Sequence, residues 1–415
     1  MTGPLWETLP EGWQAGQVKH AATVTLGKML QSNDSGGDVR APYMRAANVQ
    51  PDGALSLNDV NEMWFSEAEL EQLSIRAGDV VVVEGGQGGF GRAAYVDEEL
   101  SGWGFQNSIN RLRPIGGFDG RFIAFYLIAL RASGFVHAYS NVVSMPHLTA
   151  EKLARIPIPL PPPEEQRTIA NYLARETARI DTLIEEQQRL IEMLRERRRA
   201  VPMHAILQPT GSATDKLGRT ARIGNGSTPR RDSAIYWRGG HVPWLNSSVV
   251  NKSRVSGAEQ FVTAVALREC HLPVVAPGSV LVGLTGQGKT RGMATILDIE
   301  ATVNQHVAYV TPDRSRWLPE YLLWSLRAAY DELRRLSEEN GSTKGGLTCE
   351  ALKQFRLAVP PLDEQRRIAA YLDEQTAKID TLIAETERFI ELARERRAAL
   401  ITAAVTGQID VREAA

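Results

Sequence analysis

Residues 161–200 of this 415-residue chain recur as residues 360–399, and 25 of the 40 aligned positions are identical. The two copies lie 199 residues apart, which is about half of the chain. Arrays of short repeats have periods of roughly 20–50 residues, so this longer period indicates a unit that is used twice. Each unit is expected to contain one domain followed by one copy of the repeated segment.

Each copy of the repeat is predicted to form one long helix. In the first copy a run of prolines ends at Pro163, and Glu164 and Glu165 then place negative charge in the first turn. Arginines such as Arg198 follow near the other end, and this polarity suits the helix dipole. Apolar residues recur every three or four positions and form one stripe. The most economical way to bury two stripes, each roughly 60 Å long, is to pack the copies together as a coiled coil.

Length and composition place the chain among ordinary globular proteins of two or three domains. No run of 18 apolar residues and no N-terminal signal is visible in the sequence, so a cytoplasmic protein is expected. Cys270 and Cys349 have no metal-ligand spacing, and no histidine pair has the spacing of a zinc site. The net charge of −2 neither implies nor excludes nucleic acid as a partner.

The segments before the two helices share one pattern, which predicts an α+β domain. Residues 76–96 and 276–297 each indicate a buried strand, a glycine-rich hairpin turn and a second strand. Residues 121–132 and 318–330 each predict an apolar helix. The predicted organisation is a first domain at 1–155, a first long helix at 156–206, a second domain at 207–354, a second long helix at 355–406 and a tail at 407–415.

Residues 283–290, GLTGQGKT, fit the phosphate-loop pattern of nucleotide-binding proteins. A phosphate loop must open a helix, because the helix N-terminus supplies part of the anion site. The residues that follow are β-prone, and the matching stretch of the first domain lacks the lysine. A glycine-rich β-hairpin is therefore favoured over a nucleotide site.

The two domains share apolar and glycine positions but differ in most polar residues. This contrast predicts two related binding sites that recognise different targets. Arginine and lysine pair with guanine edges, asparagine and glutamine pair with adenine, and serine contacts either bases or phosphates. No catalytic or metal-binding residue is predicted. The DNA-binding candidates in the first domain are Arg45, Asn48, Gln87, Arg92, Asn107, Ser140 and Asn141. Those in the second domain are Arg230, Arg231, Asn246, Ser247, Ser248, Gln287, Lys289, Arg291, Asn304, Gln305, Asn340, Ser342 and Lys344.

The chain contains the doubled segments PPPEEQRTIANYL…IDTLI and PPLDEQRRIAAYL…IDTLI, and each follows a domain with a GDVVVV or GSVLVG strand. In this arrangement the chain resembles the specificity subunit of type I restriction-modification systems. The resemblance covers essentially the whole chain. It implies an α+β fold in which two similar target-recognition domains are joined by two long helices, packed as an antiparallel coiled coil with pseudo-two-fold symmetry. It also implies that each domain reads one half of a bipartite site in double-stranded DNA.

The resemblance further implies that this chain is not itself catalytic and holds no cofactor. Two modification (methyltransferase) subunits would bring S-adenosylmethionine, and restriction subunits, where present, would bring ATP and magnesium. No membrane partner is implied. Two other functions stay open: a nucleotide-hydrolysing protein that uses residues 283–290, and a coiled-coil scaffold with two protein-binding domains and no DNA affinity.

Overall fold

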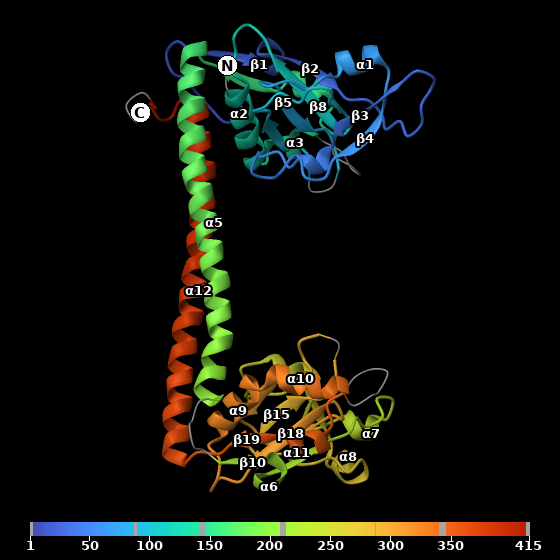
Figure 1. Ribbon diagram of the computed structural model, residues 1–415, viewed down its shortest axis with the longest axis vertical. Helices are drawn as coiled ribbons and strands as arrows, with labels where there is room; N and C mark the ends of the chain where they lie inside the picture. Colours follow the sequence, from blue (N-terminus) through green and yellow to red (C-terminus); the bar gives the residue numbers. More distant parts are fainter. Residues whose placement is uncertain are drawn as a thin grey trace. The chain divides into compact units, whose positions relative to one another are not determined.

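The computed structural model describes residues 3–86, 89–140, 147–207, 213–286, 288–339 and 346–411 (Figure 1). The chain divides into two units. Unit 1 comprises Met1–Gln188 and Arg388–Ala415, and unit 2 comprises Arg189–Glu387. Each unit contains one α+β head and a segment of both long helices, so the duplication predicted from the sequence is confirmed.

The head of unit 1 is built on three groups of paired strands. An antiparallel sheet has the order β2 (Ala22–Leu26), β8 (Ile109–Pro114), β5 (Val80–Val83) and β6 (Ala93–Tyr95). A second sheet has the order β4 (Asn61–Phe65), β3 (Val39–Met44) and β7 (Gly104–Phe105), and β1 (Gln14–Gln17) pairs with β9 (Pro157–Leu160). The helices are η1 (Val18–His20), η2 (Ala46–Asn48), α1 (Glu67–Gln72), α2 (Gly120–Ala132), α3 (Phe135–Ser140) and α4 (Ala150–Ala154).

The head of unit 2 repeats this plan. Its larger sheet has the order β11 (Ala221–Asn225), β18 (Val307–Pro312), β15 (Val280–Gly283), β16 (Ala294–Leu297) and β13 (Arg254–Val255). The second sheet has the order β14 (Gln260–Val262), β12 (Val242–Leu245) and β17 (Thr302–Val303), and β10 (Thr214–Lys216) pairs with β19 (Arg356–Ala358). The helices are α6 (Leu217–Thr220), α7 (Ala234–Trp237), η3 (Ser247–Asn251), α8 (Ala264–Glu269), α9 (Pro319–Ala328), α10 (Tyr330–Glu339) and α11 (Cys349–Gln354).

The strand at the centre of each head is apolar along its whole length because it is buried on both faces. In β5, Val80 and Val82 belong to the core that also holds α2. Val81 and Val83 point to the opposite face and belong to the core that lines β3 and β4. Strand β15 divides its side chains between two cores in the same way. The strands on either side of each glycine-rich segment pair antiparallel, as predicted.

The long helices are α5 (Pro163–Leu207) and α12 (Leu362–Val405). They start seven residues later than the predicted boundaries at 156 and 355. The reason is that β9 and β19 occupy part of that stretch and pair with the first strand of their own head. Prolines 161, 162, 360 and 361 then separate strand from helix, since proline lacks the N–H that a continued ladder needs. Pro202 lies inside α5, which continues past it.

Within each unit the two helices pack antiparallel, which confirms the predicted coiled coil. In unit 1 the start of α5 and the end of α12 enter one core, through Leu173 and Ile401 for example. In unit 2 the end of α5 and the start of α12 do the same. Each unit also has an ion pair across the helices. Arg397 Nε lies 2.9 Å from Asp181 Oδ1 in unit 1, and Arg198 Nη2 lies 2.9 Å from Asp380 Oδ2 in unit 2. Asp181 and Arg198 in the first copy of the repeat correspond to Asp380 and Arg397 in the second, so the two ion pairs are equivalent.

The glutamine of the repeated P-P-x-x-E-Q motif joins the start of each long helix to its head by hydrogen bonds. Gln365 is fully buried; its Oε1 accepts from the Leu318 N–H at 2.8 Å, and its Nε2 donates to the carbonyls of Arg316 at 2.7 Å and Pro360 at 2.8 Å. Gln166 has the corresponding position in unit 1: its Oε1 accepts from the Asp119 N–H at 3.1 Å, and its Nε2 donates to the Pro161 carbonyl at 2.8 Å. The motif therefore has a structural role at the start of each long helix.

Substitution of Gln365 by alanine is expected to lower the stability of unit 2 by about 1–3 kcal/mol, because it leaves buried backbone groups without partners. Hydrogen exchange at the start of α9 measures the loss. Arg366→Ala is the matched control, since the Arg366 side chain is exposed and should change stability by less than about 0.5 kcal/mol. Equal protection in the two variants would contradict a structural role for the motif glutamine.

Candidate nucleic-acid interface

Loops from several strands of unit 2 meet at one end of its sheets. The turn between β17 and β18 carries Gln305, which is exposed. The Asn225 Nδ2 at the end of β11 donates to the Gln305 carbonyl at 3.1 Å, and Thr228 Oγ1 donates to Gln305 Oε1 at 2.6 Å. The Asn304 N–H donates to the carbonyl of Leu245 at the end of β12 at 2.9 Å. Side chains from distant parts of the sequence thus form one polar surface, called here the sheet-end surface of unit 2.

His306 extends this surface toward the glycine-rich hairpin. Its Nε2 lies 3.2 Å from Gln305 Nε2, and its Nδ1 lies 3.0 Å from Thr285 Oγ1. The Gln305 amide nitrogen can only donate, so Nε2 accepts, and in the neutral ring Nδ1 then carries the proton and donates to Thr285. The network presents donors and acceptors in a defined order, which is the property needed to read base edges.

Asn246, Ser247 and Ser248 lie beside this network at the start of η3. Asn246 Oδ1 accepts from the Ser248 N–H at 2.9 Å and from Ser248 Oγ at 2.6 Å, so Asn246 caps the short helix. Ser248 is exposed and Ser247 is half-buried. Asn246 shapes the turn, and Ser248 is the most exposed member of this group.

Unit 1 builds the same surface on the same backbone hydrogen bonds. The Leu284 N–H donates to the His306 carbonyl at 2.9 Å in unit 2, and the Glu84 N–H donates to the Ser108 carbonyl at 2.8 Å in unit 1. The bond from Asn304 to Leu245 is matched by one from Gln106 to Met44, also at 2.9 Å.

The side chains on this common frame differ. Asn107 occupies the place of Gln305, Ser108 that of His306, and Arg45 that of Asn246. Thr228, Thr285 and Asn225 of unit 2 were not among the candidates chosen from the sequence. Their part in the network depends on loop contacts that the sequence pattern does not display.

Several predicted DNA-binding residues are buried and form hydrogen bonds or ion pairs within the fold. Asn48, Ser140, Arg291 and Asn304 are 2, 2, 8 and 5 % exposed. Asn48 holds the turn after β3 through the Arg45 N–H and the Ser56 carbonyl. Ser140 Oγ donates to the His137 carbonyl, Arg291 Nη2 lies 3.1 Å from Glu338 Oε1, and Asn304 Oδ1 accepts from the His306 N–H. A buried side chain whose bonds are internal is not available to a DNA edge.

Arg92 lies away from the sheet-end surface. It lines a cavity of about 570 Å³ between the head of unit 1 and its helices, together with Arg131 and Arg397. Its Nη1 donates to the Val49 carbonyl at 3.3 Å. Burial lowers the pKa of the neighbouring Arg131, and the positive charge of Arg92 adds to the effect. Arg92 therefore belongs to the contact between head and helices inside unit 1.

The other basic candidates of unit 2 within the described residues, Arg230, Arg231 and Lys289, are exposed. Lys289 lies in the hairpin between β15 and β16, and its carbonyl accepts from Tyr330 Oη at 3.0 Å. Arg231 donates to Gln260 Oε1 at 2.8 Å, and its guanidinium lies 4.3 and 4.7 Å from the ring centres of Trp237 and Trp244. Arg230 pairs with Asp232 at 3.2 Å.

In unit 1, Arg45 pairs with Asp59, and Asn107 is half-buried. Six candidates lie outside the described residues: Gln87, Asn141, Gln287, Asn340, Ser342 and Lys344.

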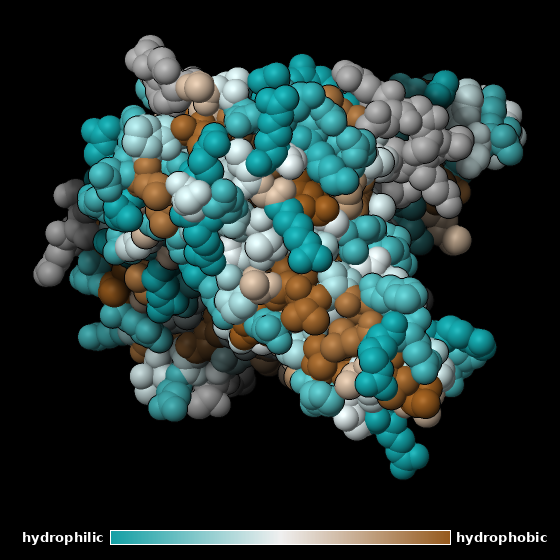
Figure 2. Space-filling view, turned by 90° about the horizontal axis from the view of Figure 1, so that it is seen from below, coloured by the Kyte–Doolittle hydropathy of each residue, from teal (hydrophilic) through white to brown (hydrophobic). Residues whose placement is uncertain are grey.

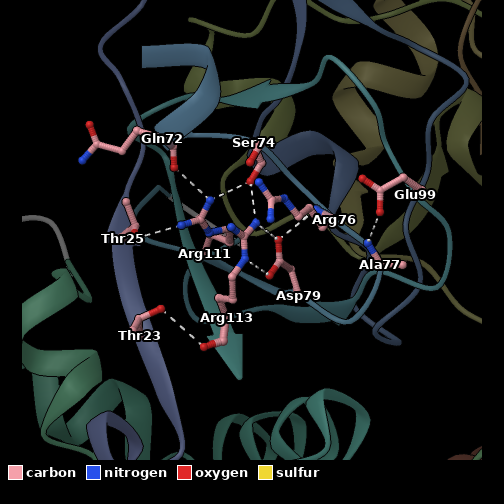
Figure 3. A network of polar contacts seen from close by, with 10 residues as sticks. All are labelled: Thr23, Thr25, Gln72, Ser74, Arg76, Ala77, Asp79, Glu99, Arg111 and Arg113. Carbon is pink, nitrogen blue, oxygen red and sulfur yellow. Dashed lines mark hydrogen bonds and ion pairs between the residues drawn. The ribbon is translucent and has the colours of Figure 1, made fainter. Parts of the chain in front are cut away.

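A largely buried charge network on β8 and around the start of β5 supports the sheet of unit 1 (Figure 3). Arg111 Nη1 donates to the carbonyls of Gln72 at 3.1 Å and Ser74 at 2.6 Å, and its Nη2 donates to Thr25 Oγ1 at 3.2 Å. Burial, helped by the like charge of Arg113, lowers the pKa of Arg111 to about 10, so it stays charged at neutral pH. Arg113 in turn binds both carboxylate oxygens of Asp79, at 2.9 and 2.8 Å.

The described residues contain no cluster of three or more histidine, cysteine, aspartate or glutamate side chains that could hold a metal ion. Residues 283–286 and 288–290 form a hairpin between two strands and open no helix. Among the helices of the described segments, none combines the length and apolarity that crossing a membrane requires.

Comparison with protein families gives a match for both halves of the chain. Residues 10–193 and 209–391 each match the family described as "Type I restriction modification DNA specificity domain". The chain is 21 % identical over 245 residues to the Type I restriction enzyme EcoR124I/EcoR124II specificity subunit of Escherichia coli. The alignment covers 58 % of this chain and 60 % of that protein, so it spans less than two thirds of the relative.

Two solved structures share the fold along nearly the whole chain. One is the HsdS subunit from Thermoanaerobacter tengcongensis, with a TM-score of 0.65 and 19 % identity, covering 98 % of this chain and 99 % of that one. The other comes from a study of complex assembly and conformational transition of the type I R-M system. Its TM-score is 0.76 at 19 % identity, and the match covers 97 % of this chain and 100 % of that one.

Proposed function

Because the chain belongs to the family of the type I restriction-modification DNA specificity domain and carries that domain twice, we propose that it reads a bipartite site in double-stranded DNA. Each head reads one half-site with its sheet-end surface. The observation that carries the proposal is the common backbone frame with different side chains, such as Asn107 against Gln305 and Ser108 against His306. Because the two surfaces present different side chains to the base edges, the two halves of the target are expected to differ in sequence.

The side chains proposed to contact DNA are the exposed or half-buried candidates of the two surfaces. They are Arg45 and Asn107 in unit 1, and Arg230, Arg231, Asn246, Ser247, Ser248, Lys289 and Gln305 in unit 2. Thr228 and His306 join them through the network described above. The proposal also includes the six candidates outside the described residues.

The proposed partners are two methyltransferase subunits that carry S-adenosylmethionine, with restriction subunits that carry ATP and magnesium where the system has them. Apolar residues on the long helices are exposed enough to receive such partners. In unit 1 Phe389 and Leu392 are 43 and 48 % exposed, and in unit 2 Met193 and Leu382 are 59 and 48 % exposed. Met193 and Leu392 are matching positions of the repeat, so the two faces suit two copies of one partner. Figure 2 shows hydrophobic residues gathered in patches on an otherwise largely hydrophilic face.

In this proposal the chain itself catalyses nothing; the partners perform the chemistry. Hydrolysis of a nucleotide by residues 283–290 is not favoured, because the hairpin lacks the helix N-terminus that a phosphate loop uses.

The proposal is tested by mapping methylated bases in DNA treated with the complex of this chain and its methyltransferase partners. The expected map has one target with two short specified halves around an unspecified spacer. A single continuous target, or modification without sequence preference, would contradict two-headed reading. Methylation by the partners without this chain is the control and should show no target.

A further inference from the structure

The two heads carry opposite net charge although they share one fold. Residues 1–160 contain 12 Lys/Arg against 17 Asp/Glu, a net charge of −5. Residues 208–360 contain 19 Lys/Arg against 13 Asp/Glu, a net charge of +6. DNA is a polyanion, and the phosphates that a protein neutralises contribute a large share of its affinity for DNA. The two heads therefore differ in the electrostatic contribution that each can make to DNA affinity.

In unit 1 three basic side chains, one in the loop after β2 and two in or directly after β3, are paired with acids. Lys28 pairs with Glu69, Arg40 with Glu62 at 3.0 Å, and Arg45 with Asp59. The three acids come from one short stretch, residues 59–69.

The loop that carries Lys28 is attached to the surface, because the Asn107 N–H donates to the Lys28 carbonyl at 2.8 Å. Its next two residues are apolar and unusually open: Met29 is 75 % exposed and Leu30 is 53 % exposed. Unit 1 thus offers DNA a neutralised surface with apolar side chains. These suit thymine methyl groups and base faces rather than phosphates.

In unit 2 the corresponding surface keeps cations without acid partners. Among the described residues, Lys289 and Arg231 form no ion pair, and the Arg231 guanidinium is held by the Gln260 amide and two tryptophan rings. Counted on from the last paired residues, Leu26 in unit 1 and Asn225 in unit 2, the position of Met29 corresponds to Thr228, a hydrogen-bonding residue. Unit 2 therefore offers both fixed positive charge and polar contacts.

From this contrast we propose that the two heads divide the work of DNA binding. Unit 2 is the electrostatic anchor that supplies most of the phosphate contacts. Unit 1 adds discrimination through polar and apolar base contacts, and its acids at residues 59–69 keep it from binding DNA without regard to sequence. This division rests on the proposed DNA-reading function and deepens it.

The test measures how the affinity of the full chain, in complex with its methyltransferase partners, depends on salt. The probes are a DNA duplex with the mapped target and a scrambled duplex of equal length. Lys289→Gln is expected to reduce the slope of log Kobs against log[salt] by about 0.9, the value for one phosphate contact. Arg40→Gln is the matched removal of one exposed cation in unit 1 and should leave the slope unchanged. Glu62→Gln frees Arg40, and it should steepen the slope by about 0.9 and strengthen binding to the scrambled duplex.

The outcomes separate this proposal from the function on which it rests. Loss of preference for the target duplex by the unaltered complex would overturn the proposed function itself. Intact preference with equal slope changes for Lys289→Gln and Arg40→Gln would overturn only the division of work. An unchanged slope for Glu62→Gln would show that the acids of unit 1 do not restrain DNA binding. Circular dichroism of each variant confirms that the fold is retained.

Discussion

Replacing Arg113 with alanine is expected to destabilise unit 1 by about 2–3 kcal/mol, because the substitution leaves the Asp79 carboxylate buried without its counter-ion. Asp79 is 1 % exposed, and Arg113 binds both of its oxygens. The expected loss lies at or below the lower end of the range for broken buried ion pairs, since 28 % of the Arg113 side chain is still exposed. Loss of amide hydrogen-exchange protection in β5 and β8 measures the effect in the unit where it arises.

The second unit provides the control for this variant. At the positions that match Asp79 and Arg113, unit 2 has Ser279 and Thr311, whose hydroxyl oxygens lie 2.8 Å apart. The double variant Asp79→Ser, Arg113→Thr removes the charge and installs that neutral pair. It should recover protection to within about 1 kcal/mol of the unaltered chain, because no buried charge is left unpaired. Equal losses in the single and double variants would show that the ion pair is not what Arg113 contributes.

Replacing Gln305 with alanine is expected to relax the target at one base pair of one half-site, at a cost of about 1–3 kcal/mol in discrimination. Gln305 is exposed, and its amide is oriented by Thr228 and His306, which is the arrangement that a specific contact to a base edge needs. The map of methylated sites should lose preference at that position only.

Asn107→Ala is the reciprocal variant, because Asn107 occupies the place of Gln305 in unit 1. It should relax the other half-site and leave the first unchanged. If both variants relaxed the same half-site, or weakened all sites alike, the two sheet-end surfaces would not be separate readers.

The repeated segment was sufficient to predict much of the fold. Its apolar spacing and terminal charges predict a long helix, and its recurrence predicts two such helices that bury one another's stripes. The hairpins after Val83 and Gly283 were also predictable, because a buried strand followed by glycines has few alternatives. These features are local or periodic, so a linear pattern contains them.

Which polar residues reach the surface was decided by tertiary structure alone. Asn48 and Arg291 have the same side-chain chemistry as residues that read DNA, yet both are buried and bond within the fold, Asn48 to the Ser56 carbonyl and Arg291 to the Glu338 carboxylate. Gln305 is exposed because strand pairing places its turn at the end of the sheet, where Thr228 and His306 meet it. The exposure and orientation of a side chain depend on contacts between segments that are far apart in the chain. The sequence by itself therefore determined the duplicated architecture, and only the folded chain determined which of its polar groups form a site.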